Sequence, residues 1–396
     1  MRVSQSYHGL AAVTVCVALL AAGPPARADC SGAPSPCARD FAIQYPEKPT
    51  TPPAMQGSTH EITFNHNGGK TLWMTAPNYG EGVSVGMDAT FKFHKMPDGA
   101  MPHGIAFDKA GQLWVSFEHV AGHMTGPGGH GAPSGDSSGQ IARLDPVSGK
   151  VLKRYNVNTD PHGLGIGPDG KTVWFTGKTK GTVGYLKPDG TAVNFALPNQ
   201  NSDGPEKDKP YPIYIAAGSD GNMWFTELQG NRIGRVTPAG KISEFPIPTP
   251  NSRPIAIIKE PSGTALWFSE EAGNKVARID MKGTITEFAV PVRKMSPQPN
   301  YMLAGLAFDA EGNVWTQQYV AQTDGNPPGP DYIVMIGKSI RSAKPSDKLD
   351  FTYYEVPTRN TVMHRIIQGP DMNMWYTELK ADKIGRIDRK PRQSKM

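Results

Sequence analysis

Four histidines hold the same place in a repeated phrase. His60, His103, His162 and His364 each stand eleven to thirteen residues before a tryptophan, and two of them open short apolar runs, "HGIAF" and "HGLGI". A neutral imidazole accepts a proton near neutral pH, and imidazole also binds transition metals well. The chemistry open to these side chains therefore depends on whether the fold gathers them in one place.

The seven tryptophans define the repeat. Each lies in a phrase such as "GQLWVSF" or "GNMWFTE", and the spacing between successive tryptophans runs from 41 to 60 residues. Each phrase predicts an apolar strand, a polar turn with glycine, the tryptophan strand, a third strand such as "RIGRV" and a fourth that ends in proline. This is the period of a propeller blade with its loops. We predict an all-β fold, a seven-bladed β-propeller over residues 41–390, with the tryptophans packed between blades.

The two ends of the repeat are incomplete in a complementary way. The blade that starts at Met363 has only three strands before the chain ends, whereas "FAIQYP" at residues 41–46 looks like a fourth strand with no blade before it. An N-terminal strand that completes the last blade would remove the open edges of the ring. We therefore expect the propeller to close in this way.

Ring closure would place the four histidines side by side. The blades that carry His364, His60, His103 and His162 are consecutive around the ring, whereas the other three blades have Ile213, Ile255 and Ala304 at this position. The first strand of a blade is innermost, so these side chains should line the mouth of the central channel. The long segments 118–139, 199–211 and 321–331 should emerge on the same face, and loops on a rigid frame commonly carry function.

Carboxylates are expected near the same channel mouth. Glu118 follows a tryptophan strand, and Asp160 stands two residues before His162. Three further glutamates, Glu227, Glu270 and Glu378, recur in "WFTE"-type phrases around the ring, so we expect them to be structural.

The phrase "WFTE…NRIGRVTPAGKISEFPIPTPNSRP" (residues 224–254) and the "PHGI" phrases resemble the streptogramin B lyases, also called virginiamycin B lyases, over nearly all of residues 41–390. The resemblance implies a seven-bladed propeller that opens a cyclic depsipeptide at its ester without water. In that reaction Mg²⁺ polarises the carbonyl, a histidine removes the adjacent proton and the carboxylate departs. The family pattern has a histidine in one blade. The neighbouring blade has an acidic residue before Pro-His and a glutamate four residues after the tryptophan.

Two placements of this pattern fit in part. With His60 and His103 as the pair, Glu118 is retained, but Met101 stands where the acidic residue belongs. With His103 and His162 as the pair, Asp160 is retained, but Lys178 replaces the glutamate. His103 belongs to both placements and is the first candidate for the base. The resemblance thus implies catalytic roles for His103 and His162, substrate binding by His60 and His364, and Mg²⁺ binding by Glu118 and Asp160.

Other functions stay open. Four histidines at one channel mouth could hold Fe²⁺, Zn²⁺ or Cu²⁺ in a different metalloenzyme. A propeller without catalytic activity could use the same surface to bind a peptide, a glycan or an envelope partner. A calcium-dependent lactonase ranks lower, because its metal site would use acidic residues and asparagine.

The N-terminus predicts export. Residues 1–28 have the features of a signal peptide, with an apolar run and an A-x-A site at Ala26 to Ala28, so we expect a periplasmic or secreted protein. Residues 29–40 form an N-terminal segment in which Cys30 and Cys37 either form a disulfide or remain thiols. No other stretch is long and apolar enough to span a membrane.

Charge and composition limit the partners. The formal net charge of +5 falls to +3 when Arg2 and Arg27 leave with the signal, which is too little to indicate nucleic-acid binding. Residues 391–396 form a basic, solvated tail. We expect a monomer that acts on a small molecule or a cyclic peptide.

Overall fold

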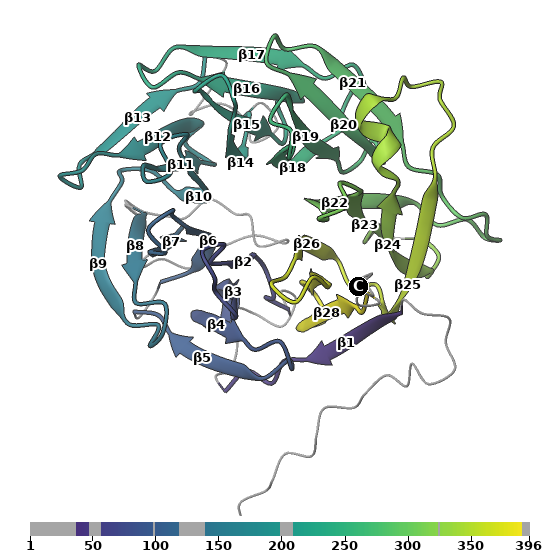
Figure 1. The fold of residues 1–396 in the computed structure, drawn as a ribbon, viewed down its shortest axis with the longest axis horizontal. Helices are drawn as coiled ribbons and strands as arrows, with labels where there is room; N and C mark the ends of the chain where they lie inside the picture. The colour runs from purple at the N-terminus through teal and green to yellow at the C-terminus, as the bar shows by residue number, and fades with distance from the viewer. Residues whose placement is uncertain are drawn as a thin grey trace, which may run out of the picture.

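The computed structural model describes residues 37–46, 57–97, 100–118, 139–198, 209–323 and 325–389. Seven four-stranded sheets stand around a central axis, which confirms the predicted propeller (Figure 1). In the first six blades the strands follow chain order from the centre outward, and every pair of neighbouring strands within a blade is antiparallel.

Each blade runs from an innermost strand at the channel to an outermost strand at the rim. In that order, blade 1 consists of β2 (Ile62–Phe64), β3 (Leu72–Ala76), β4 (Glu81–Val85) and β5 (Phe91–Lys95). Blade 2 consists of β6 (Pro102–Phe107), β7 (Leu113–Phe117), β8 (Gln140–Leu144) and β9 (Val151–Asn156). Blade 3 consists of β10 (Pro161–Ile166), β11 (Val173–Gly177), β12 (Thr182–Leu186) and β13 (Ala192–Ala196). Blade 4 consists of β14 (Pro212–Ala217), β15 (Met223–Glu227), β16 (Arg232–Val236) and β17 (Ile242–Pro246).

Blade 5 consists of β18 (Pro254–Lys259), β19 (Ala265–Glu270), β20 (Lys275–Asp280) and β21 (Ile285–Ala289). Blade 6 consists of β22 (Tyr301–Phe308), β23 (Val314–Val320), β24 (Pro330–Ile336) and β25 (Phe351–Arg359). Blade 7 consists of β26 (Met363–Gln368), β27 (Met374–Glu378), β28 (Lys383–Ile387) and β1 (Ala38–Ala42). Two short 3-10 helices, η2 (Pro77–Tyr79) and η4 (Lys338–Ser342), lie in blades 1 and 6.

The N-terminal strand closes the ring, as predicted. β1 pairs with β28 in antiparallel register, with Phe41 opposite Ile384. The strand begins at Ala38, three residues before the predicted start, because the polar residues at its beginning also have partners. Arg39 forms an ion pair with Asp388 at 2.7 Å, and Asp40 accepts hydrogen bonds from Thr358. Cys37 is disulfide-bonded, which agrees with the disulfide alternative, but Cys30 lies outside the described residues.

The tryptophans form the walls between blades. Every one lies on the second strand of its blade and is at least nine-tenths buried. Trp73 of blade 1, for example, packs against Ile105 and Leu113 of blade 2. Five of the rings donate their indole N–H to a carboxylate in the preceding turn, as Trp114 does to Asp108 at 3.0 Å. The predicted packing role of the tryptophans is confirmed.

A hydroxyl two residues after the tryptophan ties each of several blades to the next. Thr75 donates to the carbonyl of His103 at 2.7 Å, Ser116 to that of His162 at 2.9 Å, and Thr377 to that of His60 at 2.9 Å. These bonds fix the backbone of three of the four histidines against the neighbouring blade. The Trp-x-Thr/Ser spacing is visible in the sequence, but its role becomes clear only in the ring.

The residue after the histidine must be small in some blades. A Cβ atom added to Gly104 would lie 2.5 Å from the carbonyl oxygen of His162, and one added to Gly163 would lie 2.1 Å from that of Ile213. The register also shifts at this point, between Pro102 and Ile105 in blade 2. Such bulges bend a strand locally. Here glycine lets the innermost strands approach closely, which brings their histidines together.

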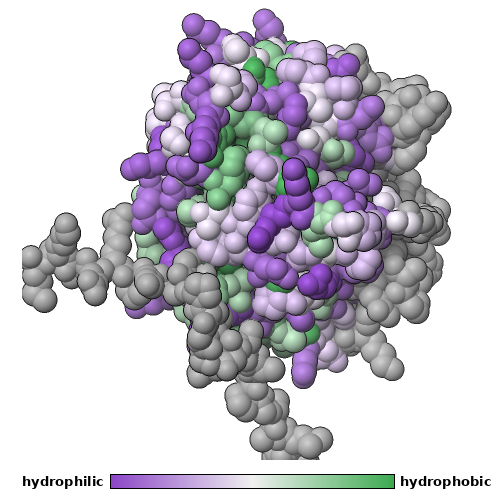
Figure 2. All heavy atoms as spheres, turned by 90° about the vertical axis from the view of Figure 1, so that its right-hand side faces the viewer, coloured by the Kyte–Doolittle hydropathy of each residue, from purple (hydrophilic) through white to green (hydrophobic). Residues whose placement is uncertain are grey.

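The outside of the ring is mainly polar. Figure 2 shows one side of it, where hydrophilic side chains cover most of the surface and apolar residues form a short band among them. Within the described residues, no helix is long and apolar enough to cross a bilayer. The apolar side chains are mostly used in packing between blades.

Candidate active site at the channel mouth

The four histidines form a continuous stack at the start of the innermost strands. The ring centroids of His364 and His60 lie 3.8 Å apart, those of His60 and His103 4.0 Å, and those of His103 and His162 3.7 Å. His60, His103 and His162 are at least 94% buried. The structure therefore brings together the histidines that the ring geometry predicts to be neighbours.

One half of the stack surrounds Glu118, and we call His103, Glu118, His162 and Lys178 the Glu118 cluster. The Glu118 Oε1 atom lies 3.2 Å from His162 Nδ1 and 3.9 Å from Lys178 Nζ, and Oε2 lies 3.9 Å from His103 Nε2. All four residues are buried. An ionised carboxylate only accepts hydrogen bonds, so His162 Nδ1 carries the hydrogen and its Nε2 is left as the basic atom.

Charges within the Glu118 cluster fix its protonation. Burial acts to raise the pKa of Glu118, but the Lys178 ammonium, together with His162 and His103, holds it well below its usual range. Burial lowers the pKa of His103 well below its ordinary value, and the neighbouring His162 lowers it further. Burial also lowers the pKa of His162, against the opposing effect of Glu118. At neutral pH the cluster thus has neutral imidazoles, a carboxylate and an ammonium.

The other half of the stack surrounds Glu61, and we call His60, Glu61, Tyr214, His364 and Arg365 the Glu61 cluster. The Tyr214 hydroxyl donates to Glu61 Oε1 at 2.5 Å and lies 2.5 Å from His364 Nε2. Arg365 Nε donates to Glu61 Oε2 at 2.6 Å, and its guanidinium lies 3.7 Å from the centroid of the Tyr214 ring. Burial acts to raise the pKa of Glu61, but Arg365 and His364 hold it below its usual range.

Sequence reasoning missed Glu61, Tyr214 and Arg365. All three occupy the position directly after the histidine or its equivalent, where the other blades have Gly104, Gly163, Ala256 and Gly305. Tyr214 extends from β14 to side chains at β2 and β26, on the opposite side of the channel (Figure 1). The signal in the sequence was that three of these seven equivalent positions hold large polar residues and four hold small ones. This pattern did not indicate which side chains would meet.

Asp160 accepts hydrogen bonds from a nearby turn. Its oxygens accept hydrogen bonds from the backbone N–H groups of Thr179 at 2.6 Å and Lys180 at 3.2 Å, in the turn after β11. It belongs to neither histidine cluster within the described residues. Both of its oxygens thus stabilise this turn, and its metal-binding role stays a prediction.

The remaining candidates lie elsewhere. Glu227, Glu270 and Glu378 are fully buried in the blade walls, and burial raises the pKa of each, in line with the expected structural role. The long segment with His119, His123 and His130 lies outside the described residues.

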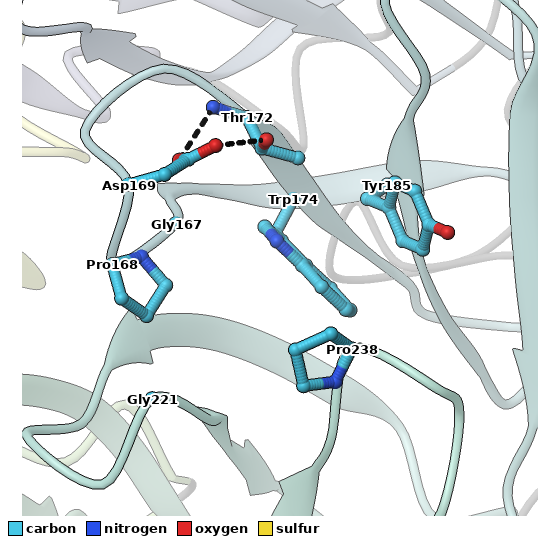
Figure 3. A pocket seen from close by; sticks show the side chains of 8 residues that line it. All are labelled: Gly167, Pro168, Asp169, Thr172, Trp174, Tyr185, Gly221 and Pro238. Carbon is cyan, nitrogen blue, oxygen red and sulfur yellow. Dashed lines mark hydrogen bonds between the residues drawn. The ribbon is translucent and has the colours of Figure 1, made fainter.

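A separate pocket of about 330 Å³ lies between blades 3 and 4 (Figure 3). Trp174, Tyr185, Pro168 and Pro238 line it, and Asp169 at its edge bonds to Thr172 at 2.6 Å. The pocket lies at the end of β10, whereas His162 lies at the beginning of that strand. The described residues that line it include a single carboxylate and no histidine, so it is a weaker candidate for catalysis than the channel mouth.

Both clusters have the make-up of a site for a transition metal more than for Mg²⁺. In each, the ligand atoms of two histidines and one glutamate lie within 4.8 Å of one another. Mg²⁺ prefers oxygen ligands in octahedral geometry. Each cluster offers one carboxylate, and a basic side chain, Lys178 or Arg365, already contacts it. The donor set of the described residues therefore does not fit Mg²⁺.

Comparison with known proteins points to one family. Residues 134–326 match the model of the virginiamycin B lyase family. Virginiamycin B lyase from Nocardia farcinica is 29% identical over 163 residues, which cover 41% of this chain and 48% of that protein. The match thus spans about half the length of this relative.

Solved structures extend the similarity over the whole ring. A streptogramin B lyase structure is 26% identical and superimposes with a TM-score of 0.66, covering 89% of this chain and 97% of that one. A catalytically inactive histidine-to-alanine variant of virginiamycin B lyase from Staphylococcus aureus, with quinupristin, is 25% identical and has a TM-score of 0.64, covering 88% and 98% of the two chains. In sequence and in fold, the chain is thus similar to the virginiamycin B lyase family, and the resemblance that its repeats predict is confirmed.

Proposed function

We propose that the protein is a carbon–oxygen lyase that opens a cyclic depsipeptide, or a similar ester or lactone, by elimination. The observation that carries this proposal is the contact between Glu118 and His162 at 3.2 Å, beside the stacked ring of His103. A buried carboxylate that orients a neutral imidazole is a common arrangement for a general base.

Residues of the Glu118 cluster carry out the proton transfer. His162 takes the proton from the carbon next to the substrate carbonyl at its Nε2 atom. The electron pair of that C–H bond forms a C=C bond, and the adjacent C–O bond breaks with its electrons leaving on the carboxylate. The imidazolium that forms is stabilised by the Glu118 carboxylate. His103, stacked 3.7 Å away, is the second candidate for the base.

The related structures support the substrate class. The Staphylococcus aureus virginiamycin B lyase described with quinupristin is catalytically inactive with one histidine replaced by alanine. A streptogramin is therefore the natural first substrate to try, and a histidine is the natural first side chain to remove. His60 and His364, at the other end of the stack, are proposed to contact the substrate.

The Mg²⁺ that the family resemblance implies has no role in these steps. Glu118 is the one carboxylate of its cluster, and Asp160 is engaged with backbone N–H groups. We further propose that residues 1–28 direct export, so that the enzyme acts in the periplasm or outside the cell. That segment lies outside the described residues.

A second candidate is a transition-metal enzyme, favoured by the two groups of two histidines and one glutamate. Imidazole is a good ligand for Fe²⁺, Zn²⁺ and Cu²⁺. Elemental analysis after gentle purification separates the two candidates. A metal at one equivalent per chain supports this second candidate, and its absence together with turnover supports the lyase.

Mass spectrometry of the products tests the lyase directly. Elimination opens the ring without changing the mass of quinupristin, whereas ester hydrolysis adds the mass of one water. We expect a product of unchanged mass that contains a new C=C bond, and we expect His162→Ala to abolish it. A hydrolysed product, or no turnover with any streptogramin or divalent metal, would contradict the proposal.

A further inference from the structure

Lys178 is a buried cation inside the candidate active site. It directly follows β11, is 2% exposed, and its Nζ lies 3.9 Å from the same Glu118 oxygen that contacts His162. A buried ammonium requires a compensating charge, which Glu118 supplies. Lys180, two residues further along the turn, is exposed to solvent. The burial of Lys178 is therefore specific to its position at the cluster.

Tyr211 lies beside this cation with an unused hydroxyl. It stands directly before β14, is 4% exposed, and its ring centroid lies 5.9 Å from Lys178 Nζ. Its hydroxyl is buried and forms no hydrogen bond within the described part of the chain. Burial of a hydroxyl without a hydrogen-bond partner costs free energy, unless a bound ligand supplies that partner. The hydroxyl can donate its hydrogen to an oxygen atom that enters the site.

We propose that Lys178 and Tyr211 bind the oxyanion of the substrate, either the enolate oxygen that forms from the carbonyl attached to the deprotonated carbon or the carboxylate that departs from the ester. Lys178 then supplies the positive charge that the resemblance assigns to a metal ion. The inference rests on the proposed elimination for the identity of the oxyanion, but the binding of a carboxylate can be measured without turnover.

Charge balance explains how Lys178 can stabilise the oxyanion although it is paired with Glu118 before the reaction. Before reaction, Lys178 neutralises Glu118, and the imidazole of His162 and the ester are uncharged. When His162 accepts the proton, its imidazolium becomes the partner of Glu118. Lys178 is then able to neutralise the oxyanion that appears at the same moment. Each negative charge thus has an adjacent positive charge before and after proton transfer, in a site where unpaired charges are costly.

The same geometry opposes a divalent cation at Glu118. Such an ion would lie close to the Lys178 ammonium, and like charges repel strongly where water is excluded. Replacement of Lys178 by glutamate would remove that repulsion and add a second carboxylate. The lysine therefore accounts for a site that resembles a metal-assisted lyase yet has a donor set unsuited to Mg²⁺.

Acetate serves as the probe for the oxyanion site. We expect acetate to shift the histidine ring signals in NMR titrations of the purified protein. Lys178→Met should weaken acetate binding at least tenfold, and Tyr211→Phe severalfold. Lys180→Met is the matched control and should leave the affinity for acetate unchanged. Because Lys178→Met leaves a buried carboxylate unpaired, Lys178→Arg is included as a second variant that keeps the charge, and it should retain acetate affinity within about threefold. Affinity for acetate that does not change in Lys178→Met and Tyr211→Phe would overturn the proposal.

Mg²⁺ titration by calorimetry gives an independent readout. The wild-type protein should show no stoichiometric Mg²⁺ binding, whereas the Lys178→Glu variant should bind one Mg²⁺ per chain. Stoichiometric Mg²⁺ binding by the wild type that disappears in Glu118→Gln would overturn the proposal. If acetate and Mg²⁺ behave as expected but no variant or wild type opens a streptogramin, the oxyanion site stands and the proposed reaction fails.

Discussion

Glu118, directly after β7 of blade 2, accepts a hydrogen bond from Nδ1 of His162 in blade 3, at 3.2 Å. The bond crosses the boundary between two blades, so the orientation of the imidazole depends on how the blades pack. The Ser116 hydroxyl, two residues before Glu118, fixes the carbonyl of His162 at 2.9 Å. The carboxylate and the imidazole are thus held together at both the side chain and the backbone.

Replacement of Glu118 by glutamine should affect both activity and stability. The amide cannot stabilise an imidazolium as a carboxylate does, so kcat should fall about 10²-fold or more. It also leaves Lys178 buried without a counter-charge, which should lower the free energy of unfolding by about 3–5 kcal/mol. Urea unfolding and streptogramin turnover measure the two effects.

The double variant Glu118→Gln/Lys178→Met is the control for the stability effect. It removes both charges, so much of the lost free energy of unfolding should return while turnover stays low. A double variant no more stable than Glu118→Gln alone would show that the ion pair is not the cause.

Removal of either imidazole of the Glu118 cluster should greatly reduce turnover without unfolding the ring. We expect His162→Ala and His103→Ala each to lower kcat/KM by about 10³-fold, because a positioned general base contributes about 10²–10⁴-fold. His66→Ala, which removes an exposed histidine at the end of β2, should have no effect. Circular dichroism checks the fold. Full activity in His103→Ala would exclude that histidine from the reaction.

The pH profile of turnover should reflect the buried imidazoles. Burial lowers the pKa values of His103 and His162, so the base should stay deprotonated below the usual titration range of histidine near 6.5. The kcat/KM should therefore be flat between about pH 7 and 8 and should fall only at acid pH. Lys178→Met removes a positive charge that helps to lower both pKa values, so the acid limb should move to higher pH. A shift to lower pH would contradict this account.

Buried glutamates in the blade walls should make stability depend on pH. Burial raises the pKa of Glu227 to about 8, with a contribution from nearby Glu244, and it raises that of Glu270 to about 8 with a contribution from Glu287. The folded state then holds protons that the unfolded chain releases near pH 4.5. The stabilisation is fully present below that pH and is lost as the pH rises through about 8, by an amount on the order of 2–4 kcal/mol per group.

Urea midpoints between pH 5 and 9 measure this loss. Glu227→Gln and Glu270→Gln mimic the protonated forms, so their midpoints should decline less with pH than those of the wild type. Glu311→Gln, at a partly exposed position, is the comparison and should follow the wild type. Equal slopes in all four proteins would show that these carboxyls are ionised in the folded state.

The repeats are enough to predict the ring and the place of the histidines in it. Seven tryptophan phrases specify seven blades, because each phrase encodes a local antiparallel sheet whose pattern repeats along the chain. The incomplete ends specify closure, and closure makes His364 a neighbour of His60. Equivalent positions in consecutive blades must lie close together at a channel mouth, so the stack of imidazoles follows from the repeat alone.

Which polar side chains meet there depends on the assembled ring. Tyr214 and Glu61 are separated by 153 positions in the chain and come from blades on different sides of the channel. Their contact depends on the width of the channel and the reach of the side chains, which no local pattern contains. The same holds for Asp160, whose oxygens bond to a nearby turn, and for Lys178, whose ammonium reaches Glu118 in another blade. A repeat fixes backbone positions through local hydrogen bonds and packing, whereas charge pairing across a channel depends on the assembled ring.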